Sequence, residues 1–240
     1  MLEKLLSNLT IEVQPFALCM LDNGWRLRLP GPPMVLVHYV LQGSGTVRGP
    51  DGATVPLAPM SIAIVPVGAK HELEIEVNGK ILNELEIVAP PDGPPIHRII
   101  AGNSDHYNLV IACGMLDARL SGSIGLFDHL RDVLTVDLSD VPQVANIFDS
   151  IFAEQSRYSY GGKVLLAALM TQLLVHVFRL LASNTQHSLP WVTALDDSRL
   201  ARVLDSVFDD PAAHHSVESM AACASLSRSA LAEQLNQALA

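Results

Sequence analysis

The feature that most constrains the fold is a change in hydrophobic period near residue 120. Before it, the chain carries short β-rich runs broken by Gly and Pro, at residues 25–29, 34–41, 46–47, 61–65, 72–77, 81–88 and 108–112. Many short runs with turn residues between them predict an antiparallel sandwich or barrel. The segment 92–106, which contains Gly93, Pro94, Pro95 and Gly102, predicts a loop before the last of these strands.

From Ser123 onward the apolar residues recur at the helical spacing of three and four positions. These residues form three sets. The first is Phe127, Leu130, Val133 and Leu134, the second lies within residues 144–152, and the third is the long run 164–182. The sequence therefore predicts an α+β fold in which an antiparallel β barrel comes first and helices follow.

The run 164–182 is nearly as long as the roughly 20 apolar residues that a membrane-spanning helix needs. Gln172, His176 and Arg179, however, are spaced at i, i+4 and i+7, which gathers the polar groups on one stripe. Burying that stripe in a bilayer is unfavourable. We therefore expect no membrane insertion, and predict a helix that packs on a neighbouring helix and on its symmetry mate in a homodimer.

Composition is that expected of a cytoplasmic oligomer. The 240-residue chain is 49% hydrophobic and 17% charged, which predicts apolar surface buried against another subunit. Its three cysteines, Cys19, Cys113 and Cys223, form no CxxC pair and no disulfide framework, which indicates a reducing compartment. Glu3 and Lys4 interrupt the apolar N-terminus, so we expect no export signal.

The polar segment 183–190 is the expected boundary before a C-terminal unit. We divide the chain into residues 1–118, a barrel with a short N-terminal helix; residues 119–189, a helical region; and residues 190–240. In the last unit Asp196, Asp197 or Ser198 can cap a helix. Its apolar stripe is formed by Leu200, Val203, Leu204, Val207 and Phe208.

Residues 216–235 have the pattern of two short helices joined by a tight turn. Small side chains at Ala221 and Ala222 allow the two helices to approach closely, and Ser227 is a natural N-cap for the second helix. The apolar inner positions are Val217, Met220, Ala221, Ala224, Leu226, Leu231 and Leu235. This pattern predicts a helix-turn-helix.

The most informative part of the β region is the hexapeptide PVGAKH, from Pro66 to His71. Pro and Gly turn the chain after the strand predicted at 61–65, so that His71 starts the next strand with its side chain on one face. Upstream, HYVLQGSG at residues 38–45 ends a strand in a Gly-rich hairpin. Because side chains alternate along a strand, His38 lies on the same face as Leu36 and can point towards His71.

These stretches resemble the two cupin motifs, PxGxxH for residues 66–71 and the YVLxGxG end of the first motif for residues 39–45. LSRSALAEQL, residues 226–235, resembles the first helix-turn-helix of AraC-family transcription regulators. Residues 191–221 and 161–181 resemble the lead-in segment and the dimerisation helix of the AraC subgroup with a cupin-type sensing domain. The resemblance covers nearly the whole chain.

The resemblance to these regulators implies three parts: a cupin (double-stranded β-helix) barrel that senses a small-molecule effector or a metal, helices that dimerise and relay the signal, and a DNA-binding region. The implied function is therefore a ligand- or metal-responsive transcription regulator, and not an enzyme. A metal-dependent cupin enzyme of the oxygenase or isomerase type is the alternative, but it needs a fuller ligand set. The resemblance to enzyme-type cupins implies a Glu in the first motif, where this chain has Leu36.

The candidate metal ligands are His38, His71 and Cys113, with Cys19 as a weaker fourth. A set of two imidazoles and a thiolate suits Zn²⁺ by ligand softness, so zinc is the expected metal. The alternative is that each His makes an ordinary hydrogen bond inside the barrel and that Cys113 is a small buried apolar side chain. The sequence leaves both interpretations open.

In the AraC family a second helix-turn-helix follows the first, so the resemblance implies a chain truncated after the first. Residues 196–240 hold three basic residues against seven acidic ones. Because phosphate contacts carry most DNA affinity, we expect this chain alone to bind DNA weakly or not at all. The candidate DNA contacts are Ser227, Arg228, Ser229 and Gln234. The alternative is that these four residues are solvent-exposed polar positions with no role in DNA binding.

Overall fold

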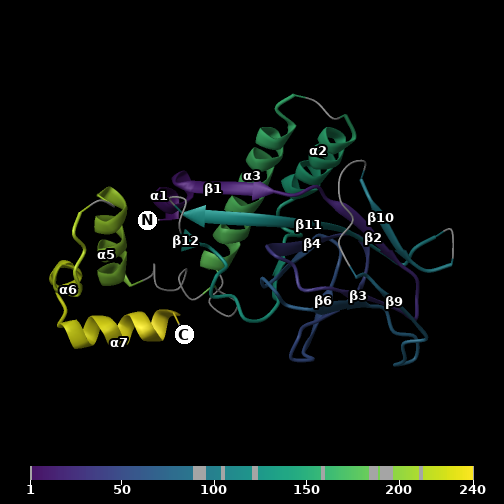
Figure 1. Ribbon diagram of the computed structural model, residues 1–240, viewed down its shortest axis with the longest axis horizontal. Helices are drawn as coiled ribbons and strands as arrows, with labels where there is room; N and C mark the ends of the chain where they lie inside the picture. Colours follow the sequence, from purple (N-terminus) through teal and green to yellow (C-terminus); the bar gives the residue numbers. More distant parts are fainter. Residues whose placement is uncertain are drawn as a thin grey trace.

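The computed structural model describes residues 2–88, 96–103, 106–120, 124–157, 160–183, 189, 197–210 and 213–239. Within these residues two sheets, of eight and five strands, form the first part of the chain (Figure 1). Sheet A consists of β1 (Leu9–Val13), β2 (Ala17–Leu21), β4 (Val35–Gly43), β7 (Ser61–Val65), β10 (Arg98–Ala101), β11 (Leu109–Leu120), β12 (Ile124–Gly125) and β13 (Leu134–Asp137). Sheet B consists of β3 (Trp25–Leu29), β5 (Gly45–Arg48), β6 (Thr54–Leu57), β8 (His71–Glu74) and β9 (Asn83–Glu86).

The strand order is β10-β2-β11-β4-β7-β13 in sheet A, with β1 and β12 also paired to β11, and β6-β5-β8-β3-β9 in sheet B. The pairs β10–β2 and β3–β9 are parallel, and the other pairs of named strands are antiparallel. Helices then follow the strands along the chain. The predicted α+β fold, with the antiparallel β layers first, is confirmed.

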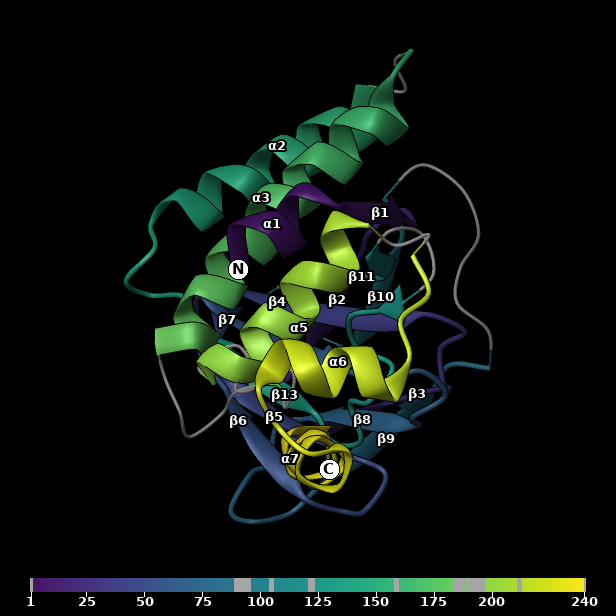
Figure 2. The same ribbon diagram turned by 90° about the vertical axis from the view of Figure 1, so that its left-hand side faces the viewer.

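The helices fall into two groups in Figures 1 and 2. The helices α2 (Gln143–Arg157) and α3 (Gly162–Ser183) run side by side over sheet A, near the short N-terminal helix α1 (Leu2–Ser7). The second group, α5 (Ser198–Asp209), α6 (Val217–Ala224) and α7 (Arg228–Leu239), lies to one side of the sheets.

Alternation along β4 divides the side chains of sheet A between two cores. Val37 and Tyr39 point outward into a cluster shared with α2 and α3, where the Tyr39 ring stacks on Phe148 with centroids 3.9 Å apart. Val40 points inward, into a cluster between the two sheets, and His38 lies on the same inward face. The period of two in β4 therefore places His38 between the sheets, as the sequence predicted.

The loop predicted at residues 92–106 contains a strand. Residues Arg98–Ala101 form β10, which pairs in parallel with β2, and Ile99 packs against the inner core. The prediction was wrong because the run is only four residues long and is surrounded by Pro and Gly. Its strand conformation depends on β2, a neighbour about 80 residues away in sequence.

The helical period predicted from Phe127, Leu130, Val133 and Leu134 is wrong as well. Residues Leu134–Asp137 form β13, which pairs with β7, and the first helix after the barrel begins at Gln143. The spacing is coincidental, because Phe127 packs in the outer core whereas Val133 packs against the inner one. Sheet A therefore extends beyond residue 118.

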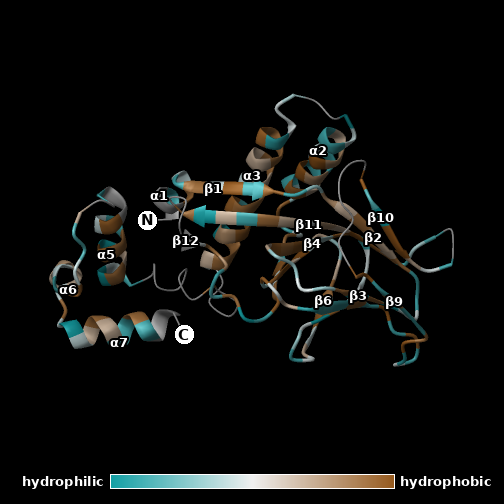
Figure 3. Ribbon diagram, in the orientation of Figure 1, coloured by the Kyte–Doolittle hydropathy of each residue, from teal (hydrophilic) through white to brown (hydrophobic). Residues whose placement is uncertain are grey.

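The helix α3 is long and apolar enough to cross a membrane by length and composition, and 39% of its most apolar window is buried within the chain. Core helices of soluble proteins have the same properties. Gln172 and Arg179 are exposed and His176 is half-buried, so the predicted polar stripe lies on the more exposed side of the helix. Figure 3 shows the mixed hydropathy along this helix. At its N-terminal end Val164 and Leu165 are exposed by 75% and 47%.

Candidate functional site

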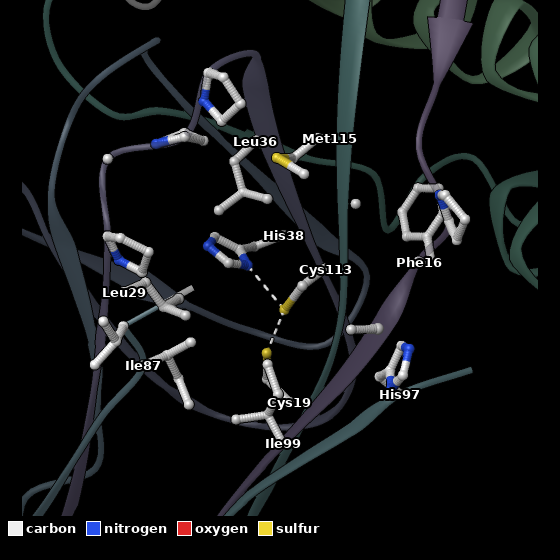
Figure 4. Close-up of a pocket in the computed structure, with 18 residues that line it drawn as sticks. Phe16, Cys19, Leu29, Leu36, His38, Ile87, His97, Ile99, Cys113 and Met115 are labelled. Carbon is white, nitrogen blue, oxygen red and sulfur yellow. Dashed lines mark hydrogen bonds between the residues drawn. The ribbon is translucent and has the colours of Figure 1, made fainter. Parts of the chain in front are cut away.

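Two histidines and two cysteines lie in a row between the sheets. The Nε2 atoms of His38 and His71 are 2.8 Å apart, and His38 Nδ1 is 3.1 Å from Cys113 Sγ. Cys113 Sγ is in turn 2.7 Å from Cys19 Sγ. Figure 4 shows His38, Cys113 and Cys19 pointing towards one another. The structure thus brings together the four residues that the sequence analysis proposed as metal ligands.

Strand register explains this juxtaposition. His38 on β4 is the direct partner of Cys113 on β11. Cys19 on β2 is paired with Ile111, two residues before Cys113 and therefore on the same face of the sheet. His71 begins β8 after a turn in which Gly68 adopts φ +74°, a conformation that favours glycine. The glycine of the hexapeptide PVGAKH is thus what allows His71 to be aimed into the barrel.

The hydrogen bonds determine the tautomers of the two imidazoles. His71 Nδ1 is 3.2 Å from the carbonyl oxygen of Ala69, which accepts only, so the neutral His71 ring carries its proton on Nδ1. Its Nε2 then accepts from His38 Nε2–H. His38 Nδ1 is left with a lone pair directed at the Cys113 thiol. With both imidazoles neutral, the single Cys113 S–H can donate either to the His38 Nδ1 lone pair or to Cys19 Sγ, and in the first case Cys19 donates to Cys113.

Burial keeps this row uncharged. The exposed fractions of His38 and His71 are 0% and 2%. Burial, with the neighbouring His71, holds the pKa of His38 well below its usual value of 6.5. Burial lowers the pKa of His71 to about 4, although the bond to Ala69 opposes the shift. Burial, with Cys19 beside it, raises the pKa of the Cys113 thiol well above its ordinary value.

A cavity of about 250 Å³ opens beside this row (Figure 4). Its described lining is largely apolar and contains neither Lys, Arg, Asp nor Glu. The lining residues come from β2, β3, β4, β10 and β11 and from the segments next to them and after β9. They are Pro15, Phe16, Ala17, Cys19, Leu29, Pro30, Gly31, Pro32, Pro33, Leu36, His38, Ile87, Val88, His97, Ile99, Cys113, Gly114 and Met115. Of this set, only His38, Cys19 and Cys113 are predicted as site residues from the sequence.

A second cavity, of about 570 Å³, borders His71 and, unlike the first, has charged side chains in its lining. Arg28 and Arg48 line it, and both form ion pairs with the carboxylates of β8. Glu74, whose side chain is fully buried, holds Arg48 at 2.9 Å and keeps a lowered pKa despite its desolvation. Arg28 and Arg48 are therefore already neutralised, and this cavity shares Leu29, Pro30, Ile87 and Val88 with the apolar cavity.

The four-residue row suits zinc by donor type but not by spacing. Two nitrogens bound to one tetrahedral zinc lie about 3.3 Å apart and two sulfurs about 3.8 Å, given Zn–N and Zn–S bonds of about 2.0 and 2.3 Å. The corresponding distances here are 2.8 and 2.7 Å, and the two His38 nitrogens point to different partners. Among the described residues, no group of three or more His, Cys, Asp or Glu is placed to hold a metal ion.

The C-terminal helices form the predicted helix-turn-helix. Ser216 caps α6, and Ser225 ends it in the left-handed conformation, at φ 57°. The turn then places Leu226, whose N–H donates to the carbonyl of Ala221. The buried residues shared by α5, α6 and α7 are Leu200, Val203, Ala221, Ala224 and Leu231. Val217, predicted on the inner face, is 48% exposed because it occupies the first turn of α6.

Three of the proposed DNA contacts lie at the N-terminal end of the second helix, and Gln234 lies in its middle. Ser227 caps α7 by accepting the N–H of Ala230, and its hydroxyl is 3.1 Å from that of Ser229. Arg228 is exposed and forms an ion pair with Glu218 on α6. Gln234 is half-buried, and its Oε1 atom is buried without a hydrogen-bond partner. The roles of these four residues stay predictions.

The three basic residues of this region all have partners within it. Arg199 pairs with Asp197, which also caps α5. Arg202 donates to the carbonyls of Cys223 and Ala224 at the end of α6, both at 3.4 Å. With Arg228 held by Glu218, the intramolecular pairs compete with phosphate for each cation.

Comparison with known proteins shows the family. The family model for cupin domains matches residues 1–183. The chain belongs to the cupin family. In this cupin, a helix-turn-helix region follows the barrel, as in AraC-type regulators. The HTH-type transcriptional regulator AlkR of Acinetobacter baylyi is 21% identical over 237 residues, which are 96% of this chain and 77% of AlkR. The predicted resemblance to AraC-family regulators with a cupin-type domain is confirmed.

Solved structures similar to this cupin include those of ToxT and CuxR. Unsaturated fatty acid-bound ToxT from Vibrio cholerae is 11% identical, with a TM-score of 0.35 over 96% of this chain and 73% of ToxT. The AraC-like transcriptional activator CuxR is 9% identical, with a TM-score of 0.34 over 96% of this chain and 71% of CuxR. At TM-scores below 0.5 these likenesses do not define the ligand of this cupin.

Proposed function

We propose that this transcription regulator responds to a small, uncharged and apolar effector that binds in the cavity between its sheets. The observation that carries the proposal is the cavity lining, which is apolar apart from neutral polar groups such as His38. A carboxylate or ammonium buried there would lose its hydration without gaining a described counter-ion. An alcohol, ketone or hydrocarbon carries no charge and would therefore not incur this loss of hydration free energy.

Phe16 supports a relay from the cavity to the helices. It lines the cavity, and its ring meets Phe148 of α2 edge-on at 5.8 Å. Its backbone N–H donates to Gln155 Oε1 at 3.1 Å, and Gln155 Nε2 donates to its carbonyl at 3.2 Å. An effector that displaces Phe16 would therefore shift α2. By favouring one placement of the helices, the effector would change the population of the DNA-binding state.

We also propose that α3 forms the interface of a homodimer. Its N-terminal turns present two adjacent exposed apolar side chains, Val164 and Leu165, on a helix that is apolar along most of its length. The relatives point to a transcription factor and not to an enzyme, and a cytoplasmic location stays a prediction. Zinc also stays a proposal, which requires the four side chains of the row to move apart before an ion can enter.

Matched probes test the effector class. We expect 1-octanol to bind at least about ten-fold more tightly than octanoate, measured by isothermal titration calorimetry, because burial of the carboxylate without a cation costs more than 1.4 kcal/mol. Ile99→Trp should abolish binding of 1-octanol by filling the cavity, whereas Ile100→Trp, on the opposite and 44% exposed face of β10, should not. Octanoate binding as tightly as 1-octanol would contradict the proposal.

Light scattering tests the dimer. At micromolar concentration the wild-type chain should have twice the mass of one chain, and Leu165→Arg should reduce it to a monomer because the new charge would be buried at the interface. Leu82→Arg is the control, since Leu82 is an apolar residue of the barrel that is 64% exposed. A monomeric wild-type chain would exclude the proposed interface.

A further inference from the structure

Binding of an apolar effector leaves the two buried thiols unexplained. Cys19 and Cys113 are 0% and 7% exposed, and their sulfur atoms are 2.7 Å apart. They lie on neighbouring strands at diagonal positions, because Cys19 is paired with Ile111 and Cys113 with Ala17. A disulfide requires an S–S separation of about 2.05 Å, so the two sulfurs need to approach by only about 0.7 Å.

A proton acceptor lies next to one of these thiols. His38 Nδ1, 3.1 Å from Cys113 Sγ, carries a lone pair because its other nitrogen donates to His71. Thiol oxidation proceeds through the thiolate, and a neighbouring imidazole is a base that can form it. Among the described residues, no imidazole forms a hydrogen bond with Cys19, so the two thiols differ in their surroundings.

The cavity gives an oxidant access to the same thiol. Both cysteines line the cavity, and of the two it is Cys113 that retains exposure. Because Cys113 is almost completely buried, an oxidant can reach its sulfur only through the cavity, next to His38. The apolar lining favours an oxidant that carries an apolar group over a charged one.

We propose that Cys113 and Cys19 form an oxidisable dithiol, which an organic hydroperoxide entering the cavity converts to a cross-strand disulfide. Cys113 gives its proton to His38 and its sulfur attacks the terminal oxygen of the hydroperoxide. The O–O bond breaks, and the departing alkoxide takes the proton from His38 and leaves as an alcohol. The resulting Cys113 sulfenic acid is attacked by Cys19, which forms the S–S bond and releases water with the proton of Cys19.

The balance is one hydroperoxide reduced to an alcohol and water for each dithiol oxidised to a disulfide. The bond ties β2 to β11 in the wall of the cavity, next to the residues that would contact the effector. Its use as a signal rests on the proposed regulator function, but the oxidation itself does not. The 1-octanol titration tests the effector proposal and the oxidation experiment tests the dithiol proposal, so either result can be negative while the other is positive.

The test treats the reduced wild-type chain with one equivalent of cumene hydroperoxide. The protein is then denatured, the remaining thiols are alkylated with iodoacetamide, and the peptides are mapped by mass spectrometry. We expect a linked pair of peptides that contain Cys19 and Cys113, with Cys223 alkylated. Cys223 lies on α6 and is partly exposed, so the Cys223→Ser variant is the matched control and should form the same linked pair.

Two variants separate the roles of the residues. In Cys19→Ser the reaction should stop at the Cys113 sulfenic acid, trapped by dimedone. In His38→Phe disulfide formation should slow by at least about ten-fold at neutral pH and recover as the pH rises, because hydroxide then replaces the base. Alkylation of both Cys19 and Cys113 in the treated wild-type chain would overturn the proposal. The proposal would also be overturned if the purified chain held one equivalent of zinc and the two thiols reacted only after the zinc had been removed.

Discussion

The two faces of sheet A are built from the same strands but differ in how they are filled. On the outer face, Val37 and Tyr39 of β4 pack against α2 and α3, and Tyr39 stacks on Phe148. On the inner face, Leu36 and His38 of the same strand border a cavity. The stacked rings on the outer face and the cavity beside His38 on the inner face indicate that the contacts with the helices supply stability and that the inner face binds.

The largest expected effect on stability comes from a substitution on the outer face. Phe148→Ala removes a fully buried ring from between Tyr39 and Phe16, so it should lower the free energy of unfolding by about 3–5 kcal/mol. Urea unfolding followed by circular dichroism measures this. A loss below about 1 kcal/mol would mean that the outer face is not the main source of stability.

An intermediate effect comes from acid on the inner face. Because burial lowers the pKa of His71 from 6.5 to about 4, the unfolded chain takes up the proton first as the pH falls. Stability should therefore be unaffected above pH 6.5 and decline between 6.5 and about 4, by about 3 kcal/mol from His71. The lowered pKa of His38 acts in the same direction.

Urea unfolding across this pH range checks the prediction. Comparing variants separates the contribution of His71 from that of the other titrating groups. His71→Gln should lose less stability on acidification than the wild-type chain. His129→Gln, which changes an exposed histidine, should follow the wild-type chain. Identical acid profiles for the wild type and His71→Gln would contradict burial of a neutral His71.

The smallest expected effect enlarges the cavity. Leu36→Ala should cost only about 1 kcal/mol, because the Leu36 side chain is half-buried and borders empty space, whereas a fully buried leucine would cost about 2–5 kcal/mol. Thermal unfolding measures the cost. A loss as large as that of Phe148→Ala would remove the difference between the two faces.

The sequence predicts the residues of the inner face better than their contacts. Alternation along β4 and the turn of the hexapeptide PVGAKH placed His38 and His71 on facing strands, because both signals are local. The contact between Cys19 and Cys113 depends on the register of β2 against β11, across 94 residues. No local pattern encodes that register.

The errors have the same origin. β10 was predicted as a loop and β13 as part of a helix, since their conformations come from pairing with β2 and β7 and not from their own short sequences. The apolar cavity also escaped prediction, because its lining is assembled from separate strands and from the segment around Pro32. The C-terminal helices were predicted well, since their caps and apolar spacing are local signals.

Hydrogen exchange with mass spectrometry on the chain with and without 1-octanol tests the central claim most directly, because it locates the effector on one face of sheet A. The cavity between the sheets predicts slower exchange in peptides from β2, β4, β10 and β11 when 1-octanol is present. Ile99→Trp should show no such protection. Protection confined to α5, α6 and α7, or equal protection in Ile99→Trp, would contradict an effector site inside the barrel.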